Sequence, residues 1–300
     1  MEFGKVAQLD NIYWNVPPDP ISVFLENPDS IAFHIGTTGW GEKDWVGNLY
    51  PKGTKTADYL SKYSEVFDTI ELNTTHYQIP DKEKIGRWYQ KSKSDFKFCP
   101  KLPRAISHHR NLGVGTGLIH LFSESIRSLN EKLGPCFMQL PPYFNSDYLS
   151  VLENFLEVWP KEIPLHLEFR NEDWFLSPMN ERISSLLMQK NKGIVMTDVA
   201  GRRDVLNLPA TNEIIFIRFV GNLGHKSDRE RIQKWIFTLS TWVKYGIREV
   251  YFFLHQPEAK AILPMYQCIK ECQIAYKIFE NKRKADFKKE ETSGNQLKIF

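Results

Sequence analysis

The chain has 300 residues, of which 42% are hydrophobic and 25% are charged, a composition typical of a folded globular protein and unlike that of a disordered chain. Its 39 Lys and Arg residues exceed its 36 Asp and Glu residues by three, and residues 281–300 alone carry six basic and three acidic residues. The rest of the chain is therefore neutral, which excludes the broadly basic surface typical of nucleic-acid-binding proteins.

Apolar runs and cysteines indicate the compartment. No run of about 18 apolar residues occurs, and the first residues lack the basic and apolar segments of a secretory signal. We therefore expect a cytoplasmic protein with no membrane association. The four cysteines form no CxxC pair and are too few for a disulfide framework, so reduced thiols are expected. Cys268 and Cys272 are spaced either as two metal ligands on one helix or as packed core residues, and we favour the core.

Eight short apolar segments alternate along the chain with segments of helical periodicity. The expected strands lie at 33–40, 69–77, 96–103, 136–142, 165–171, 193–198, 214–222 and 250–257. The expected helices lie at 56–67, 81–92, 117–134, 146–158, 179–190, 228–245 and 258–273. This order predicts an α/β fold, a single (β/α)8 TIM barrel. A doubly wound open sheet is the alternative, but "GTTGWG" and "GVGTG" lack the GxGxxG spacing of its phosphate loop.

Segments outside the repeat flank a barrel domain expected at residues 31–280. Residues 1–30 include "VPPDP", which interrupts regular structure, and we expect an N-terminal arm packed on the barrel. Residues 281–300 are highly charged, and we expect a flexible tail that ends in "QLKIF".

The terminal peptide resembles the motif by which many bacterial repair and replication proteins bind the DNA sliding clamp. A flexible linker ahead of an apolar anchor would let the anchor enter a partner's groove while the barrel stays free. A tail folded back on its own barrel, or a chance match of five residues, is the alternative. The partner-binding candidates are Gln296, Leu297, Ile299 and Phe300.

Polar residues stand near the carboxyl end of nearly every expected strand. In a closed barrel these ends meet at one mouth, so the side chains are expected to face a single cavity. The alternative is a set of ion pairs that only plugs the barrel, although buried pairs add little stability once their desolvation is counted. The residues are Glu71, Asn73, Lys101, Gln139, Glu168, Arg170, Asp198, Arg218 and His255.

These residue types predict acid–base chemistry on an anionic substrate. Lys101, Arg170 and Arg218 supply positive charge suited to carboxylate or phosphate. The catalytic candidates could serve as general acids and bases or hold a divalent metal, although no HxH or HExxH spacing supports a metal. They are Glu71, Glu168, Asp198 and His255. The other substrate-binding candidates, from strand ends and the loops that follow, are Asn73, Tyr77, His108, Gln139 and Trp174.

Several motifs, taken in order, resemble those of the YecE-like proteins, also called the domain of unknown function 72. The similar segments, between roughly residues 33 and 265, are "GTTGW", "DWVGNLYP", "IELNTTHYQIP", "FCPKLPRAISHHRNL", "MQLPPYF" and "LEFRNEDWF". The resemblance implies a TIM barrel with a polar pocket at the strand ends and no established reaction. "RFVGN" and "LHQPE" depart from the family's pattern, which leaves Arg218 a firmer candidate than His255.

The function expected is that of a TIM-barrel enzyme acting on an anionic, phosphate-bearing substrate, with Glu71 or Glu168 as the general base. Nucleic-acid processing or repair is its most specific form. A hydrolase or isomerase of sugars or sugar phosphates is the second hypothesis. The third is a ligand-binding module without catalysis that is recruited through its tail. Fold analogy alone decides between none of these, and the cofactor is unknown.

Overall fold

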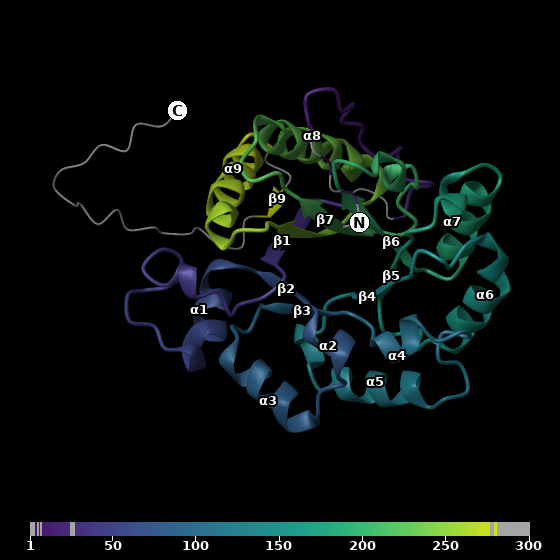
Figure 1. Ribbon diagram of the computed structural model, residues 1–300, viewed down its shortest axis with the longest axis horizontal. Coiled ribbons are helices and arrows are strands. Elements are labelled where there is room, and N and C mark those ends of the chain that lie inside the picture. Colours follow the sequence, from purple (N-terminus) through teal and green to yellow (C-terminus); the bar gives the residue numbers. More distant parts are fainter. Residues whose placement is uncertain (1–3, 5, 7, 25–27, 277–278, 281–300) are drawn as a thin grey trace.

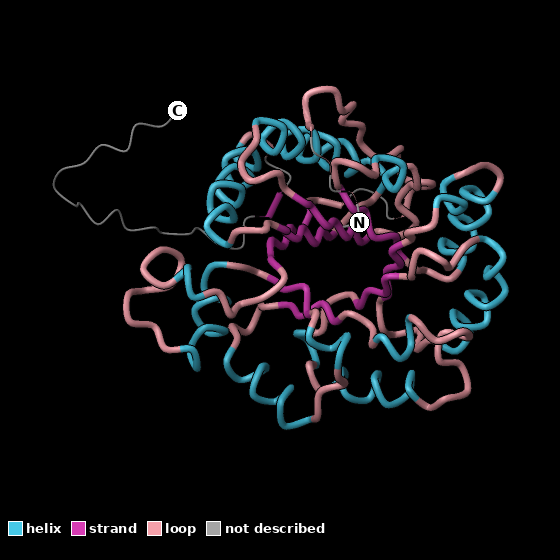
Figure 2. Tube along the Cα trace, viewed as in Figure 1, coloured by secondary structure: helices cyan, strands magenta, loops and turns pink. Residues whose placement is uncertain are grey.

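Eight parallel strands form the wall of a barrel, and helices surround it on the outside (Figure 1, Figure 2). The computed structural model describes the chain except residues 1–3, 5, 7, 25–27, 277–278 and 281–300. The strands are Ile31–Thr37 (β1), Thr69–Leu72 (β2), Lys97–Pro100 (β3), Cys136–Gln139 (β4), Leu165–Glu168 (β5), Gly193–Asp198 (β6), Ile214–Val220 (β7) and Glu249–His255 (β8). A two-residue strand, Phe279–Glu280 (β9), pairs with the start of β1.

The strands are hydrogen-bonded in the order β3-β2-β1-β8-β7-β6-β5-β4. The two ends of this path meet through backbone hydrogen bonds from Gly134 N to Phe98 O at 2.8 Å and from Leu102 N to Phe137 O at 2.9 Å. The sheet therefore curves back on itself as a nearly closed barrel. The expected (β/α)8 fold is confirmed, and the doubly wound open sheet is wrong for this chain.

The helices on the outside match the segments of helical periodicity. They are Tyr59–Val66 (α1), Lys82–Lys91 (α3), Leu118–Arg127 (α5), Leu149–Val158 (α6), Met179–Gln189 (α7), Lys226–Trp242 (α8) and Ile262–Ile274 (α9). Two short helices, Thr74–Tyr77 (α2) and Arg104–Ser107 (α4), were not expected, because four residues are too few to show a period of 3.6. The connection from β6 to β7, which is described throughout, holds a 3-10 helix at Arg203–Leu206 in place of an α-helix.

Side chains that point into the barrel occupy alternate positions on each strand. Inside, apolar side chains pack across the barrel, with the ring of Phe216 4.8 Å from that of Phe253 and 5.1 Å from that of Phe137. Two positions further along their strands stand Arg218, His255 and Gln139. The interior of the barrel is therefore apolar at its centre, and the next layer, at the carboxyl ends of the strands, is polar.

The described part of residues 1–30 lies against the β6–β7 connection and α8. Ile21 N donates to Ala210 O at 3.1 Å, and Phe24 N donates to Tyr245 O at 2.8 Å. The carboxylate of Asp19 accepts hydrogen bonds from Trp242 and Tyr245. These contacts hold the segment against the β6–β7 connection and α8, and Gly201 N donates to Gly4 O at 2.9 Å just after the carboxyl end of β6.

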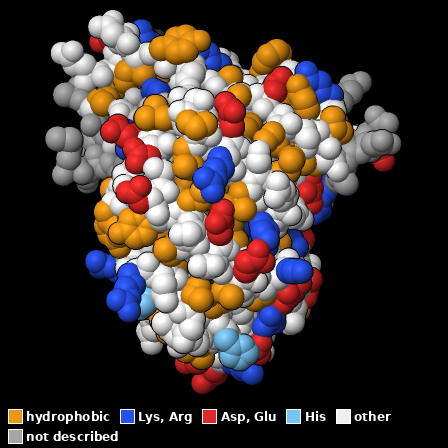
Figure 3. Space-filling view, turned by 90° about the vertical axis from the view of Figure 1, so that its right-hand side faces the viewer, with side chains coloured by type: hydrophobic (Ala, Val, Ile, Leu, Met, Phe, Trp, Pro, Cys, Tyr) orange, Lys and Arg blue, Asp and Glu red, His pale blue; other side chains and the backbone are white. Residues whose placement is uncertain are grey.

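Charges of both signs are interspersed on the face shown in Figure 3. This distribution agrees with the neutral balance of residues 1–280. Among the described residues, no helix combines the length and the apolar character needed to cross a bilayer.

Candidate functional site

Side chains from seven strands or the residues just after them meet at the carboxyl end of the barrel. We call this group the polar cup. Each member continues an inward-facing row of its strand, so residues far apart in sequence become neighbours only because the sheet closes. The members are Glu71, Asn73, Lys101, Gln139, Glu168, Arg170, Thr197, Arg218 and His255.

Arg218 lies at the centre of the polar cup and joins its two carboxylates. Its Nε and Nη2 donate to Glu71 Oε2 at 3.0 Å and Oε1 at 2.9 Å, and its Nη1 donates to Glu168 Oε2 at 2.7 Å. The two carboxylates are fully buried and Arg218 nearly so. A planar guanidinium that forks onto one carboxylate and bridges to a second fixes the orientation of all three groups.

Glu71 receives two further contacts. The amide of Asn73 donates to its Oε1 at 2.9 Å, and Nε2 of His255 lies 2.8 Å from its Oε2. Burial raises the pKa of Glu71, but the charge of Arg218 and the hydrogen bonds from His255 and Arg218 outweigh burial and hold the pKa well below its usual range. Glu71 is therefore an ionised carboxylate whose oxygens are both occupied.

Glu168 is similarly enclosed. Its Oε1 accepts from the hydroxyl of Thr197 and pairs with Arg170 Nη2, both at 2.5 Å. Burial again raises the pKa, and the nearby charges of Arg170 and Arg218 bring it below its ordinary value. Both carboxylates expected to act as general bases thus have low proton affinity in this arrangement.

Lys101 differs from the other cations of the polar cup. Its Nζ donates to the side-chain oxygen of Gln139 at 3.1 Å, and no carboxylate of the described residues lies within 4 Å of it. Burial, and secondarily the charge of Arg218, lower its pKa. Three cations, Lys101, Arg170 and Arg218, thus face two carboxylates, and the polar cup carries an excess of one positive charge without counting His255.

Asp198 lies outside the polar cup. It directly follows Thr197 on β6, so the alternation that turns Thr197 inward turns Asp198 toward the helices. Its carboxylate pairs with Arg203 and with Arg231 of α8, and it accepts from Trp235 Nε1 at 2.7 Å. The expectation that Asp198 faces the same cavity as Glu71 is wrong, and its contacts are those of an anchor for α8.

The expected aromatic contacts divide into buried and exposed residues. Trp174 is fully buried, stacks on Phe144 and donates from Nε1 to Phe144 O at 2.7 Å, so its ring supports a loop and has no open face for a substrate. Tyr77, in contrast, is 83% exposed at the end of α2. His108 is half-buried beside α2, with its ring centroid 5.8 Å from that of His76.

Three residues near the mouth escaped the sequence analysis. Thr197 is a usual strand residue, and nothing in its neighbourhood marks it as a partner of Glu168. His76 follows the polar strand end by several residues, inside a helix too short to expect. Tyr143 lies in the loop after β4 and donates from its hydroxyl to His108 O at 3.2 Å. The aromatic residues in the loops after β2 and β4 were the sequence feature that could have indicated His76 and Tyr143.

The polar cup does not fit a divalent cation. Both oxygens of Glu71 accept from Arg218, one oxygen of Glu168 does the same, and Asp198 faces the other side of β6. Across the described chain, no three His, Cys, Asp or Glu side chains are grouped to hold a metal ion.

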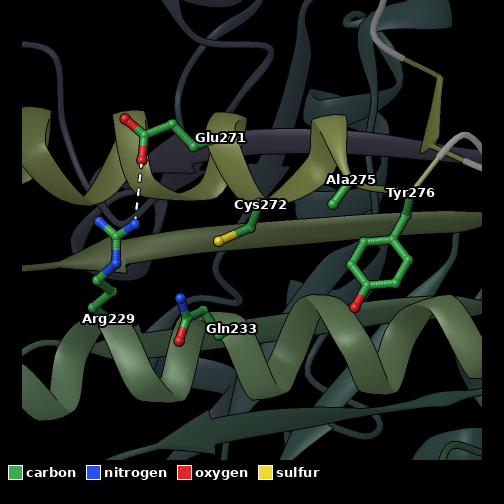
Figure 4. Close-up of a pocket in the computed structure, with 6 residues that line it drawn as sticks. All are labelled: Arg229, Gln233, Glu271, Cys272, Ala275 and Tyr276. Atoms are coloured by element: carbon green, nitrogen blue, oxygen red, sulfur yellow. Dashed lines mark ion pairs between the residues drawn. The ribbon is translucent and has the colours of Figure 1, made fainter.

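A hollow of about 390 Å³ lies between α8 and α9 (Figure 4). Cys272 points into it beside an ion pair of Arg229 with Glu271 at 3.5 Å. Cys268, one turn earlier on α9, is buried in the hydrophobic core, and Cys272 packs against that core. The two thiols thus lie in apolar packing, as the core interpretation expects. The tail candidates Gln296, Leu297, Ile299 and Phe300 lie outside the described residues.

Proteins of known sequence and structure resemble the chain over most of its length. It is 29% identical over 246 residues to UPF0759 protein YecE of Escherichia coli K12, which covers 75% of this chain and 86% of that protein. It is 29% identical over 164 residues to UPF0759 protein YunF of Bacillus subtilis, covering 51% of this chain and 56% of that protein.

Two crystal structures of DUF72 family proteins share the fold. One from Thermotoga maritima superposes with a TM-score of 0.60 at 24% identity and covers 81% of this chain and 99% of that one. One from Enterococcus faecalis gives a TM-score of 0.63 at 17% identity and covers 81% and 98%. The family described as "Protein of unknown function DUF72" matches residues 34–289. The resemblance drawn from the sequence motifs is confirmed, and the chain belongs to the DUF72 family.

Proposed function

We propose that the chain is an enzyme that binds an anionic, phosphate-bearing substrate at the mouth of its barrel. The observation that carries the proposal is Lys101, a half-buried ammonium group whose partner is the neutral oxygen of Gln139. Removing a cation from water without a counter-charge is unfavourable, and a fold seldom keeps one for stability alone. A bound anion would supply the missing charge.

The neighbouring charges support the same proposal. Arg170 is more than nine-tenths buried, and Arg202 donates from Nη1 to its backbone oxygen at 3.1 Å. Arg218 and Arg170 together offset the charges of Glu71 and Glu168, so Lys101 supplies the excess positive charge at the mouth. Phosphate oxygens suit both a guanidinium fork and an ammonium point charge.

His255 is the candidate for proton transfer. Its side chain is 18% exposed, whereas that of Glu71 is 0% exposed, so a substrate at the mouth can reach the imidazole and not the carboxylate. When Nε2–H donates to Glu71, the other ring nitrogen, Nδ1, carries the lone pair and can accept a proton. In this proposal Glu71 orients His255 and Arg218 orients Glu71, which replaces the earlier assignment of a glutamate as the base.

Binding and turnover measurements with a panel of phosphate esters test the proposal. We expect the Lys101→Met variant to lose most of its affinity for inorganic phosphate and ribose 5-phosphate in calorimetric titrations. The exposed Lys161→Met variant should bind like the wild type. If Lys101→Met bound these ions as tightly as the wild-type chain, the mouth would not be the anion site. For any ester that the wild type converts, His255→Asn should slow turnover by roughly 100-fold or more while leaving binding largely intact.

Hydrolysis or isomerisation of a sugar phosphate is the alternative reaction class, and a module that binds without catalysis is the alternative to an enzyme. The panel of phosphate esters separates these alternatives, because only an enzyme releases product.

The proposal also includes a cytoplasmic location, supported by four free cysteines. From the sequence of "QLKIF" we further propose that the tail recruits the chain to a DNA sliding clamp, which would bring a nucleic-acid-processing activity to its substrate.

A further inference from the structure

Four aromatic side chains lie beside the polar cup, on the loops that follow β2, β3 and β4. We call them the ring wall: Tyr77 and His76 from α2, His108 just after α4, and Tyr143 after β4. The ring centroids of Tyr77 and His76 are 5.4 Å apart, and those of His76 and His108 are 5.8 Å apart. The hydroxyl of Tyr143 donates to His108 O at 3.2 Å. Figure 1 shows α2 and α4 side by side at this edge of the barrel.

The ring wall is attached to the cation of the polar cup. The hydroxyl of Thr75 in α2 donates to Leu72 O at 2.8 Å and to Lys101 O at 2.7 Å, which fixes α2 against the end of β3. Asn73, the residue before α2, contacts Glu71 directly. The ring wall is therefore fixed to the residue whose ammonium group would hold the ligand.

The two imidazoles of the ring wall are uncharged at neutral pH. Burial lowers the pKa of His76 despite its hydrogen bond to Leu102 O, and burial lowers the pKa of His108 as well. His76 Nδ1 lies 2.8 Å from Leu102 O and must donate to it, which leaves Nε2 as an acceptor. A neutral aromatic surface with an acceptor nitrogen attracts a planar ring that carries an amino group more than it attracts a phosphate.

The tyrosines contribute little to the core. Tyr77 is 83% exposed and Tyr143 is 56% exposed, whereas Trp45 and Trp174, which also follow strand ends, are buried. Exposed aromatic rings beside a buried cation form a surface on which a base can stack, and such stacking tolerates any base because each has a π face. Sugars lack that face and gain less from two exposed tyrosines.

We infer that the ring wall stacks on a nucleobase whose phosphate is held at Lys101, so that the substrate class is a nucleoside phosphate. This inference rests on the proposed anion site and names the organic part of its ligand. The phosphate would occupy the mouth of the polar cup within reach of His255, and the base would lie outward over His76 and Tyr77. A nucleotide at the end of a single strand presents the same chemistry as a free nucleotide.

Calorimetric titration with AMP, ribose 5-phosphate and adenosine at pH 7.5 tests the inference. We expect AMP to bind about tenfold more tightly than ribose 5-phosphate, the effect of one stacked base. Tyr77→Ala should remove most of that difference and leave the affinity for ribose 5-phosphate unchanged, and Tyr77→Phe should keep it. Tyr13 is also 83% exposed and has no ring contact with the ring wall, so Tyr13→Ala is a matched control that should bind like the wild type.

The outcomes separate the two proposals. Equal affinities for AMP and ribose 5-phosphate in the wild type would overturn the ring wall while leaving the anion site in place. No binding of AMP, ribose 5-phosphate or inorganic phosphate would overturn both. A 5′-phosphorylated tetradeoxyadenylate distinguishes a free nucleotide from the end of a single strand. If it binds more tightly than AMP and the binding depends on Tyr77 in the same way, the site recognises the end of a strand. Binding of either nucleotide that is independent of Tyr77 contradicts the inference.

Discussion

Arg218 and Glu71 share two parallel hydrogen bonds across the barrel, of 3.0 Å and 2.9 Å, although 147 positions separate them in the sequence. Arg218 also bridges to Glu168 at 2.7 Å, so one guanidinium contacts both carboxylates, and Arg170 supplies the second positive charge beside Glu168. Burial lowers the pKa of Arg218, but the charges of Glu168 and Glu71 outweigh burial and raise it, which keeps the guanidinium charged. Arg218, Glu71 and Glu168 thus form the fixed centre of the polar cup, and Lys101 and His255 are its more exposed members.

Replacing Arg218 by Met should destabilise the protein by about 3–5 kcal/mol, because two buried carboxylates lose their common counter-charge. Urea unfolding of the wild type and the variant measures this difference. Arg248 pairs with Glu213 at 3.3 Å on the surface, and Arg248→Met should cost less than about 1 kcal/mol. Similar losses for both variants would mean that the central bridge contributes no more than a surface pair.

Stability should fall steeply with acid because the pKa values of Glu71 and Glu168 are depressed in the folded state. The unfolded chain takes up protons first, so this contribution is complete above the ordinary pKa of 4.5 and is lost as pH falls through the lower folded values. Unfolding free energies between pH 6 and pH 3 should decline less steeply for Glu71→Gln than for the wild type. The exposed Glu172→Gln variant should follow the wild-type slope, and an unchanged slope for Glu71→Gln would contradict the assignment.

His166 should make stability depend on pH in a higher window. It is fully buried on β5 with Nε2 2.8 Å from Ile214 O, and burial lowers its pKa from 6.5 to about 4. The folded state excludes a proton that the unfolded chain accepts, so stability is complete above pH 6.5 and falls by up to about 3 kcal/mol as pH drops toward 4. His166→Leu should flatten this window, whereas a variant of the exposed His120, His120→Gln, should not. Chemical denaturation at four pH values compares the slopes.

Gly193 should tolerate no side chain, because a Cβ atom there would lie 2.1 Å from the ring of His166. We expect Gly193→Ala to lower the free energy of unfolding by about 3 kcal/mol through steric overlap in the barrel. Adding His166→Ala should recover part of the loss by emptying the contested space. Gly86, inside α3 with open space around it, is the matched control, and Gly86→Ala should stabilise by about 0.5–1 kcal/mol. A double variant no better than Gly193→Ala would reject the steric explanation.

Lys101→Met should raise the melting temperature while abolishing anion binding. Keeping the charged lysine partly out of water costs desolvation free energy. An apolar side chain of similar length avoids that cost, so we expect the free energy of unfolding to rise by about 1 kcal/mol. Lys132 is a matched control, since it is also buried but donates to Tyr89 O, Ser92 O and Ser92 Oγ. Lys132→Met should therefore destabilise. Scanning calorimetry without ligand measures whether each variant raises or lowers the melting temperature. A lower melting temperature for Lys101→Met would show that the lysine stabilises the fold.

Strand count, helix positions and family membership could be predicted from the sequence, because apolar period and motif order are local properties of the chain. The residues of the mouth could be predicted as a set for the same reason, since polar residues at strand ends stand out against apolar runs. Which of them meet could not. Thr197 and Asp198 are adjacent in the sequence, and both sides of β6 are buried, so burial gives no sign of which faces inward.

The closed sheet decided that question. Closure brings Glu71, Glu168 and Arg218 within hydrogen-bonding distance of one another, and it sends Asp198 to the helix layer and Trp174 beneath a loop. Closure of the sheet also determined which cations lie beside each carboxylate. Those cations determine whether the carboxylate can act as a base or is a fixed counter-ion. The sequence by itself determined which chemical groups are present at the strand ends, and the tertiary structure determined their partners, since pairing depends on distances that no local pattern encodes.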